Sequence, residues 1–450
     1  MTDTQLFLQH VAANADFIHP TRPTKIGRGP GRLDVMGGIA DYSGSLVLQW
    51  PLARAAYCAV QFCDEPVVAM RSLNAAEIDA ERDVTAPLEV IAQGNYAQAH
   101  AALTGDPARA WAAYAAGALV VMARELGVAL TRGMRLLVHS DVPAGKGVSS
   151  SAALEVACMR AACDLLGVQL APRQLAILCQ KAENLVVGAP CGVMDQMSSA
   201  CGEPGKLLAL RCQPAQLLPS VALPDGLRVW GIDSGIRHAV SGSDYTAVRV
   251  GAFMGYRIIA GLDGLPVRLM DGIAQVDDPR RNGYLANITP AEWEAHYQDR
   301  VPLEMRGDDF LAQFGGTTDS VTRVNPARTY AIRQPAAHPI YENARVEAWH
   351  TALSSPPAER GRGWEENMGE LMYESHASYG ACGLGSEGTD RLVQMAREAG
   401  AERGIYGAKI TGGGSGGTVA VLACANAEPA VRAIAQRYAQ ETGRGGSLLD

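Results

Sequence analysis

A short run rich in glycine and serine, Pro143 to Ala153, constrains this chain more than any other segment. It reads PAGKGVSSSAA and stands between a strand-like run and a helix with apolar periodicity. Gly145 and Gly147 allow backbone conformations that turn N–H groups into a concavity, and the following helix presents its positive end to the same place. Such a loop can hold phosphate groups, although an N-capped helix after a tight turn explains the same residues. Its spacing is not the G-x-x-x-x-G-K-[ST] of a P-loop.

A second glycine-rich segment follows Lys409-Ile410-Thr411 and precedes a strand-like run from Thr418 to Leu422. Five glycines lie within the six residues 412 to 417. A flexible hairpin connection is one explanation, but so dense a cluster of glycines is entropically unfavourable. The cluster therefore indicates a place where a ligand or another stretch of backbone approaches closely.

An arginine stands among glycines near the start of the chain, in the stretch from Gly29 to Gly44 that also contains Asp34 and Asp41. Arg32 can place a rigid, permanently charged fork against a phosphoryl group, and an aspartate can bind two neighbouring sugar hydroxyls. An ion pair at the protein surface between Arg32 and either aspartate explains the same residues.

Two carboxylates, Glu183 and Asp195, form a further candidate site, the second within Cys191 to Gln196. A buried carboxylate such as Asp195 can take the proton of a substrate hydroxyl, or orient and polarise that hydroxyl. Glu183 can hold Mg²⁺ directly or through water. Alternatively, Glu183 lies on a solvated helix face and Asp195 belongs to a turn or cap.

The composition is that of an ordinary globular enzyme. The chain has 450 residues, of which 48% are hydrophobic and 19% charged, and this length allows two or three domains. A formal net charge of -8 offers no basic field to polyanions, so we expect no nucleic-acid partner. The ten cysteines contain no C-x-x-C pair, which favours a reduced, cytoplasmic chain.

We expect neither a secretory signal nor a membrane segment. The first residues lack a basic region and a cleavage-site pattern after an apolar core. The longest apolar stretch, Ala110 to Ala123, is shorter than the roughly 18 residues of a membrane span. It therefore predicts a core helix.

Short strand-like runs alternate with helical patterns along the chain. The sequence predicts strands at Met134 to Val138, Lys206 to Leu210 and Leu227 to Asp233. It predicts helices at about Ser151 to Leu166 and Trp364 to Tyr379. The class is a mixture of α and β.

Together these motifs resemble the GHMP kinases, and specifically their galactokinase branch, from about Arg28 to Leu422. The early signature of that branch, P-G-R-V-N-L-I-G-E-H-T-D-Y-N-G, is matched at Pro30, Gly31, Arg32, Gly37, Asp41, Tyr42 and Gly44. Further matches are Trp111 to Gly117, Arg237-His238 followed by Asp244-Tyr245, and Glu374-Ser375-His376.

The resemblance implies an α+β, two-domain GHMP kinase fold with the active site in the cleft between the domains. Residues 1–225 would form an N-terminal mixed α/β domain with the sugar loop and the phosphate loop. Residues 226–450 would form a C-terminal ferredoxin-like α+β domain. A segment at about 257–335 would be inserted in it, with no role that the sequence assigns.

The resemblance also implies roles for individual residues, with ATP and Mg²⁺ as cofactors. Arg32 would neutralise the migrating phosphoryl group and support ionisation of Asp195, which would act as base or only orient the hydroxyl. Ser151 and Glu183 would contact Mg²⁺. The residues at ATP would be Trp111 and Tyr114 near adenine, and Gly145, Lys146, Gly147, Val148, Ser149, Ser150 and Ser151 at the phosphates. The residues at the sugar would be Asp41, Gly38, Ile39, Gly192, Asp195 and Tyr245.

The chain departs from the galactokinase pattern at Gly38 and Ile39, where that branch carries Glu and His. The family's Glu binds the C6 hydroxyl of the sugar, so its loss points to a sugar without that group. L-Arabinopyranose keeps galactose's configuration at the other ring carbons. The string GRLDVMGGIADYSGSLVLQ also resembles the kinase domain of plant-type L-arabinokinases, whose additional N-terminal domain we expect to be absent. A further departure is Lys146, which would contact phosphate or point to solvent.

The resemblance therefore implies an ATP-dependent sugar 1-kinase that converts L-arabinose to L-arabinose 1-phosphate by direct in-line transfer. A galactokinase is one alternative, and a non-catalytic regulator that binds sugar and ATP is another. The expected partners are a monosaccharide and ATP, without nucleic acid or membrane. The oligomeric state stays open.

Overall fold

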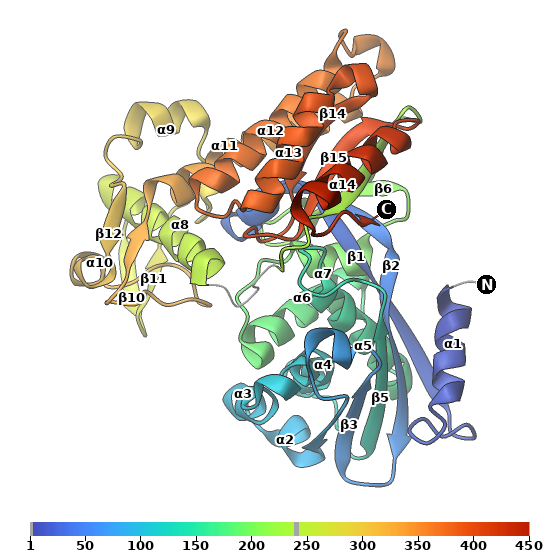
Figure 1. The fold of residues 1–450 in the computed structure, drawn as a ribbon. Coiled ribbons are helices and arrows are strands. Elements are labelled where there is room, and N and C mark those ends of the chain that lie inside the picture. The colour runs from blue at the N-terminus through green and yellow to red at the C-terminus, as the bar shows by residue number, and fades with distance from the viewer. Residues whose placement is uncertain (1–2, 238–242, 450) are drawn as a thin grey trace. The chain divides into compact units, whose positions relative to one another are not determined.

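The computed structural model describes residues 3–237 and 243–449, and these residues form two compact units (Figure 1). The first unit comprises Met1–Arg32, Pro51–Ala144 and Ser149–Pro204. The second comprises Leu33–Trp50, Gly145–Val148 and Gly205–Asp450. His238 of the predicted Arg237-His238 pair lies outside the described residues.

The division differs from the single boundary between residues 225 and 226 that the sequence predicts. The units interleave along the chain because two long strands, β1 (Thr24–Met36) and β2 (Leu46–Cys63), each contribute residues to both. The phosphate loop is divided as well, since Gly145–Val148 belong to the second unit and Ser149 to the first.

The first unit is built on a mixed sheet. Its strand β3 (Val67–Ser72) pairs in parallel with β5 (Gly133–Ser140) and antiparallel with β4 (Asp83–Pro87), and β5 pairs antiparallel with residues 56–63 of β2. The predicted strand at Met134 to Val138 is thus confirmed as part of β5.

Apolar helices pack with this sheet. The predicted core helix is α4 (Trp111–Glu125), in which most alanines and valines are buried, and it packs against α5 (Ser150–Leu166) and α6 (Pro172–Ala182). The predicted helix at 151–166 is therefore confirmed. The remaining elements of this unit are α1 (Asp3–Ala13), η2 (Ala75–Ile78), α2 (Leu88–Gln93), α3 (Tyr96–Thr104), η3 (Pro107–Arg109), η4 (Glu183–Val187) and α7 (Met194–Cys201).

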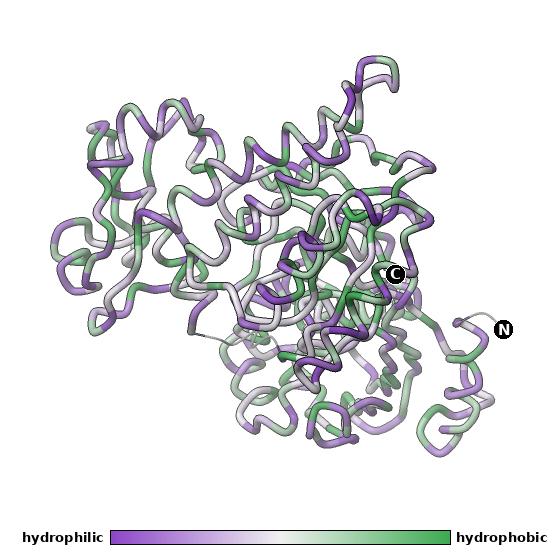
Figure 2. The backbone as a smooth tube through the Cα atoms, turned by 45° about the horizontal axis from the view of Figure 1, so that its top comes forward, coloured by the Kyte–Doolittle hydropathy of each residue, from purple (hydrophilic) through white to green (hydrophobic). Residues whose placement is uncertain are grey.

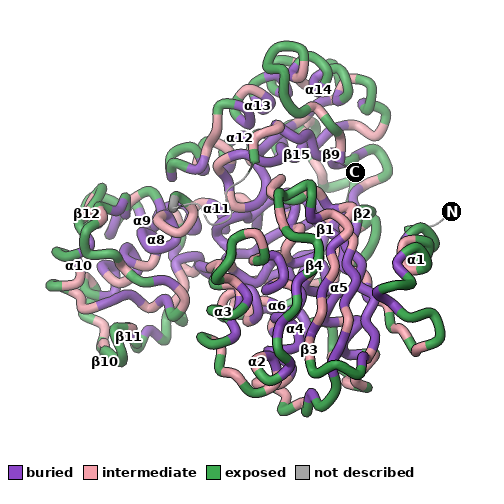
Figure 3. The backbone as a smooth tube through the Cα atoms, turned by 60° about the horizontal axis from the view of Figure 1, so that its bottom comes forward, coloured by how far each residue is buried: buried purple, intermediate pink, exposed green. Residues whose placement is uncertain are grey.

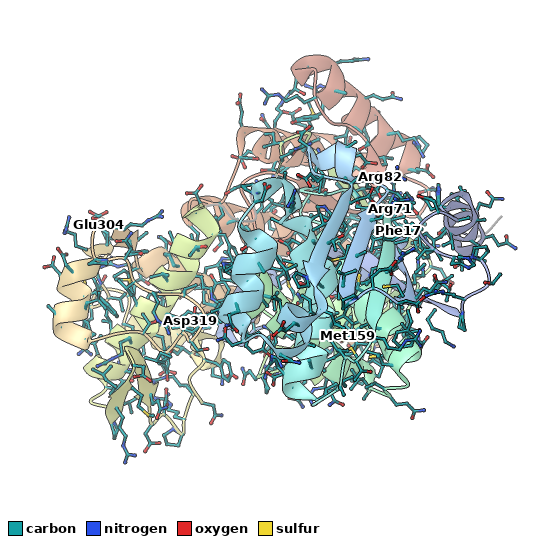
Figure 4. The ribbon with its side chains drawn as sticks, turned by 90° about the horizontal axis from the view of Figure 1, so that it is seen from below. Phe17, Arg71, Arg82, Met159, Glu304 and Asp319 are labelled. Atoms are coloured by element: carbon teal, nitrogen blue, oxygen red, sulfur yellow. The ribbon has the colours of Figure 1, made fainter. Side chains whose placement is uncertain are left out.

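A polar cluster joins the segment after α1 to the strands. The guanidinium of Arg71 lies 4.5 Å from the ring centroid of Phe17 and pairs with Asp83, while Arg82 donates to Asn14 (Figure 4). These contacts hold the segment after α1 against β3 and β4.

The second unit contains an antiparallel sheet in the order β14 (Ile405–Ile410), β15 (Thr418–Cys424), β9 (Leu227–Asp233) and β16 (Leu448–Leu449). This arrangement confirms the predicted strands at 227–233 and 418–422. The apolar side chains of α13 (Glu387–Ala399) and α14 (Glu428–Thr442) share a core with β9, β14 and β15. The strands β15 and β9 are largely buried, whereas α14 carries exposed stretches (Figure 3).

A separate core lies between α8 (Ser243–Leu262) and α11 (Arg333–Ser354). The predicted bounds of the insertion, 257 and 335, fall inside these two helices, so the segment between them is 263–332. Polar and apolar stretches alternate along it (Figure 2). Its elements are β10 (Val267–Met270), β11 (Ile273–Val276), η5 (Leu285–Asn287), α9 (Pro290–His296), β12 (Glu304–Arg306), α10 (Gly307–Phe314) and β13 (Thr329–Ala331).

The other elements of the second unit complete the fold. The predicted helix at 364–379 is α12 (Trp364–Ala381). The predicted strand at 206–210 is β6 (Lys206–Arg211), which pairs with residues 46–49 of β2. The rest are η1 (Gly38–Ser43), β7 (Gln216–Leu217), β8 (Val221–Ala222), η6 (Pro357–Glu359) and η7 (Ala401–Arg403). Within the described ranges, no helix has the length and apolarity to span a membrane.

Candidate active site

Arg32 and Asp195, which are 163 residues apart, meet in the first unit. Arg32 is the last residue of β1 in this unit, and Asp195 is the second residue of α7. The Arg32 guanidinium donates to Asp195 Oδ1 from Nε at 3.0 Å and from Nη2 at 2.7 Å. The Arg32 side chain is 2% exposed and that of Asp195 is 25% exposed. The buried Arg32 guanidinium therefore positions Asp195, and part of the Asp195 side chain remains exposed to solvent.

A cluster of acidic side chains lies next to this pair. The amide nitrogen of Gln196 donates to the carboxylates of both Glu155 and Glu183, and the Ser151 hydroxyl also bonds to Glu183. Burial, together with the nearby charge of Asp195, raises the pKa of Glu183 to about 7. Burial and the charge of Glu183 raise the pKa of Glu155 well above its usual range. Burial and mutual repulsion thus disfavour the ionised forms of both glutamates.

This cluster fits a divalent cation. The predicted metal-binding pair, Ser151 and Glu183, supplies a hydroxyl and a carboxylate, which are the oxygen donors that Mg²⁺ takes from a protein when substrate phosphates complete its shell. Among the described residues, no group of three or more His, Cys, Asp or Glu is arranged to hold a metal by itself. Glu183 also begins η4, a π-helical turn, which is a feature frequent at functional sites.

The structure places Trp111 and Tyr114 at the start of α4. The Trp111 indole N–H donates to the backbone oxygen of Glu81 at 2.8 Å. Burial raises the pKa of the Tyr114 phenol, with further contributions from Glu183 and Glu155. Tyr114 therefore lies near the acidic cluster, and the predicted contact of both aromatic residues with adenine stays a prediction.

Ser149 has a strained backbone at the point where the phosphate loop enters α5. It is the residue before the helix and has a φ of 61°, a conformation that non-glycine residues rarely adopt. Its hydroxyl oxygen is buried and has no hydrogen-bond partner among the described residues. Strain and an unsatisfied buried polar group together indicate a functional position. Ser150 and Ser151 then form the first turn of α5.

In the second unit, residues 145–148 of the phosphate loop pack on the glycine-rich segment 412–417. The Thr418 hydroxyl donates to the Lys146 backbone oxygen at 2.8 Å. A Cβ at Gly412 would lie 2.7 Å from the Gly147 oxygen. The glycines of 412–417 thus allow two loops to approach each other, as the sequence indicated.

Two further residues of this part of the phosphate loop have definite places. The Lys146 ammonium lies 3.0 Å from an oxygen of Asp233, so Lys146 makes an ion pair instead of pointing to solvent. Val148 is buried.

The predicted sugar loop, residues 37–44, lies in the same unit and is buried. Asp41 accepts from the Tyr42 N–H at 2.7 Å, and the rings of Tyr42 and Tyr245 pack edge to face with centroids 6.0 Å apart. Ile39 is buried in the apolar core formed with Tyr42 and α8, so position 39 offers no polar side chain. Gly192, by contrast, belongs to the first unit, where it is buried three residues before Asp195.

An ion pair that sequence reasoning missed supports the sugar loop. Asp34 and Lys409 have fully buried side chains and pair with each other. Asp34 also accepts from the Gly38 N–H at 3.0 Å and from the Gln49 amide at 2.7 Å. A lysine within the apolar strand Ile405–Ile410 was the available signal, because buried lysines need a partner.

Glu155 and Gln196 were also missed. The signal was a glutamate on the mostly apolar helix α5, four residues after Ser151 and therefore on the same face. Gln196 directly follows Asp195 and offered no separate signal.

Comparison with known proteins agrees with this geometry. The chain matches the GHMP kinases N terminal domain over residues 113–203 and the GHMP kinases C terminal domain over residues 362–440. It is 44% identical to an L-arabinokinase of Arabidopsis thaliana over 93% of this chain, and it spans 44% of the length of that protein. It is 32% identical to a galactokinase of Chloroflexus aggregans, over 94% of this chain and 90% of the relative.

A solved structure confirms the predicted fold. Lactococcus lactis galactokinase in complex with galactose superposes with a TM-score of 0.74 and 21% sequence identity, covering 98% of this chain and 97% of the galactokinase. The chain therefore belongs to the GHMP kinase family, in the branch that contains the galactokinases.

Proposed function

We propose that the protein is an ATP-dependent sugar 1-kinase that phosphorylates L-arabinose to L-arabinose 1-phosphate. The observation that carries the proposal is the pairing of Arg32 with Asp195 beside the carboxylate of Glu183 and the hydroxyl of Ser151. These are the groups that in-line phosphoryl transfer needs: a carboxylate for the attacking hydroxyl, a cation for the transferred group and oxygen ligands for a metal.

Asp195 acts on the attacking hydroxyl of the sugar. The Arg32 guanidinium donates two hydrogen bonds to Asp195 Oδ1, and one quarter of the Asp195 side chain remains exposed. The Asp195 carboxylate can accept a hydrogen bond from the sugar hydroxyl and take its proton as the bond to phosphorus forms, or orient the hydroxyl without taking the proton.

Arg32 also stabilises the transferred phosphoryl group. Its charge is permanent and buried, so it needs no reorganisation when negative charge moves onto the phosphoryl oxygens. Most of the rate enhancement in this type of reaction comes from such positioning and charge stabilisation.

Phosphate recognition rests on the loop from Gly145 to Ser151. The backbone N–H groups at the start of α5 are donors for anionic oxygens, and so is the Ser149 hydroxyl, which has no hydrogen-bond partner among the described residues. Ser151 and Glu183 would hold Mg²⁺, which would supply the charge that neutralises the ATP phosphates. Burial and the nearby charge of Asp195 raise the pKa of Glu183 to about 7, and a cation bound there would favour the ionised carboxylate.

The choice of L-arabinose rests on the sugar loop. Gly38 carries no side chain and Ile39 is buried among apolar residues, so neither position offers a polar side chain to a C6 hydroxyl. The L-arabinokinase relative, at 44% identity, supports the same choice.

A second candidate substrate is D-galactose, because a relative named galactokinase aligns over 90% of its own length. A non-catalytic regulator is disfavoured because Arg32, Ser151, Glu183 and Asp195 are all present. We also propose a cytoplasmic location, which the ten free cysteines support.

A panel of three sugars tests the proposal. The assay couples ADP release to a colour reaction, with L-arabinose, D-galactose or D-fucose as the substrate. D-Fucose is galactose with a methyl group in place of the CH₂OH. We expect kcat/KM to fall from L-arabinose to D-fucose to D-galactose. Phosphorus NMR should show the phosphate of the product on C1. A higher kcat/KM for D-galactose than for L-arabinose would refute the choice of sugar. Sugar binding by calorimetry without ADP release would instead support the regulator.

A further inference from the structure

The backbone at Gly38 leaves no room for a side chain, and Tyr379 makes the closest approach. A Cβ at Gly38 would lie 1.5 Å from the hydroxyl oxygen of Tyr379, 2.6 Å from its Cζ atom and 2.8 Å from Asp34 Oδ2. All three distances are inside van der Waals contact, and the first is by far the shortest. Gly38 also has a φ of +32°, which is unfavourable for other residues. The Tyr379 hydroxyl thus occupies the place where a side chain at position 38 would begin.

Tyr379 is held firmly in this place. It lies near the end of α12, and its side chain is fully buried. Its ring packs edge to face on His338 with centroids 5.3 Å apart, and the Lys409 ammonium lies 5.2 Å from the ring centroid. The ring therefore cannot swing aside to admit a side chain at position 38.

The same hydroxyl bonds to two loops. It accepts from the Ile39 N–H at 2.9 Å and donates to the Gly412 backbone oxygen at 3.0 Å. One buried hydroxyl thereby ties the sugar loop to the glycine-rich segment 412–417, which packs on residues 145–148. Removing it would leave a buried backbone N–H at Ile39 without this partner.

We propose that Tyr379 is a specificity-determining residue that acts through the sugar loop. Its hydroxyl excludes every side chain from position 38 and fixes the backbone of residues 38 and 39, so that the sugar meets backbone and apolar surface there. This inference rests on the proposed function, in which residues 37–44 form the sugar-binding loop. It predicts that Tyr379 affects sugar recognition more than the chemical step.

The first test removes only the hydroxyl. In Tyr379→Phe we expect the KM for L-arabinose at saturating ATP to rise about tenfold, with kcat within about threefold, because a loop that is less well fixed weakens sugar binding. Tyr373→Phe is the matched control, since Tyr373 lies on the same helix but packs in the core of the β14–β15–β9 sheet. An unchanged KM in Tyr379→Phe, or the same rise in Tyr373→Phe, would overturn the proposal.

The second test addresses the steric exclusion with a double-mutant cycle. Gly38→Ala should lower kcat/KM for L-arabinose at least a hundredfold in the wild-type background. In the Tyr379→Leu background, where the para carbon and hydroxyl are gone, the same substitution should lower kcat/KM by no more than about tenfold. The remaining loss comes from backbone strain and from Asp34 Oδ2, which lies 2.8 Å from the added Cβ. Equal losses in the two backgrounds would contradict the steric argument. Circular dichroism and thermal unfolding show which variants fold. If a variant with Gly38→Ala does not fold, the measurement on Tyr379→Phe alone tests the proposal.

The outcome is separable from the proposed function. Each variant is measured with the sugar that the wild-type enzyme prefers, whichever of the three that is. If D-galactose is preferred and its KM still rises in Tyr379→Phe, the choice of L-arabinose is wrong and the role of Tyr379 stands. If L-arabinose is preferred and its KM does not change, only the role of Tyr379 is wrong.

Discussion

The substitution Asp195→Asn tests whether Asp195 acts in catalysis or only forms a structural ion pair with Arg32. It keeps the shape of the side chain and the Oδ1 atom that accepts both bonds from Arg32, but it removes the charge. A hydrogen bond to a charged group contributes about 1.5–3 kcal/mol, against about 0.5–1.5 kcal/mol for a neutral one. Because the Asp195 side chain is 25% exposed, we expect a loss of only about 1–2 kcal/mol in the free energy of unfolding.

The effect on catalysis should be larger than the effect on folding. Loss of a group that takes or orients a proton typically costs 10²- to 10⁴-fold in rate, which corresponds to about 3–5 kcal/mol in the barrier. The assay measures kcat by coupled ADP release with L-arabinose, and urea unfolding measures stability on the same preparation. A fall in kcat of less than tenfold would remove Asp195 from the mechanism.

Asp278→Asn is the control for this experiment. Asp278 is buried, accepts a hydrogen bond from Tyr256 and lies 3.6 Å from Arg281, but it belongs to the inserted segment 263–332. Its substitution should lower the free energy of unfolding by an amount similar to or larger than that for Asp195→Asn while kcat stays within about threefold. If both variants lost activity in proportion to stability, the effect of Asp195→Asn would be structural.

Three further predictions concern the charged cluster, the buried network and the glycine-rich loop. In metal-free buffer the Glu183 carboxyl, whose pKa is raised to about 7, should stabilise the fold fully below pH about 4.5, and about 3 kcal/mol should be lost as the pH rises through 7. Glu183→Gln should abolish this slope in urea unfolding and weaken activation by Mg²⁺ about tenfold or more; an unchanged Mg²⁺ titration would contradict the metal role. Burial alone would raise the pKa of Glu342, but the charges of Arg345, His338 and Lys409 lower it to about 2. Glu342 should therefore contribute about 3 kcal/mol above pH 4.5 that disappears as the pH falls through 2, so the stability curves of wild type and Glu342→Gln should converge in acid, and parallel curves would refute this. Gly412→Ala should raise the KM for ATP about tenfold because its Cβ would meet the Gly147 oxygen at 2.7 Å, whereas Gly443→Ala, with a φ of +68° and no atom within 4 Å, should not.

Local patterns in the sequence predicted the elements well. The apolar stretch at 110–123 and the strand-like run at 227–233 appear as α4 and β9, because elements that are buried on most sides are rich in apolar residues over a short stretch of sequence. The glycine-rich segments were also recognisable, since close approach of two backbones requires residues without side chains. The resemblance to a known family added the fold, which no local pattern contains.

Pairings between distant residues were not visible in the sequence. Arg32 had two nearer aspartates as possible partners, and the tertiary structure pairs it with Asp195, 163 positions away. Asp34, one of those two, pairs instead with Lys409. The two compact units also divide the chain in a way that no local pattern shows, because β1 and β2 each contribute residues to both units.

The sugar loop combines both kinds of information. The sequence by itself determined that positions 38 and 39 carry no polar side chain, and this is the basis for proposing that the loop determines substrate choice. Only the tertiary structure decided why position 38 has to be glycine: the hydroxyl of Tyr379, 341 residues along the chain, already fills that space. The physical reason is that a residue type records what a position can contain, whereas excluded volume depends on which distant side chain packs against it.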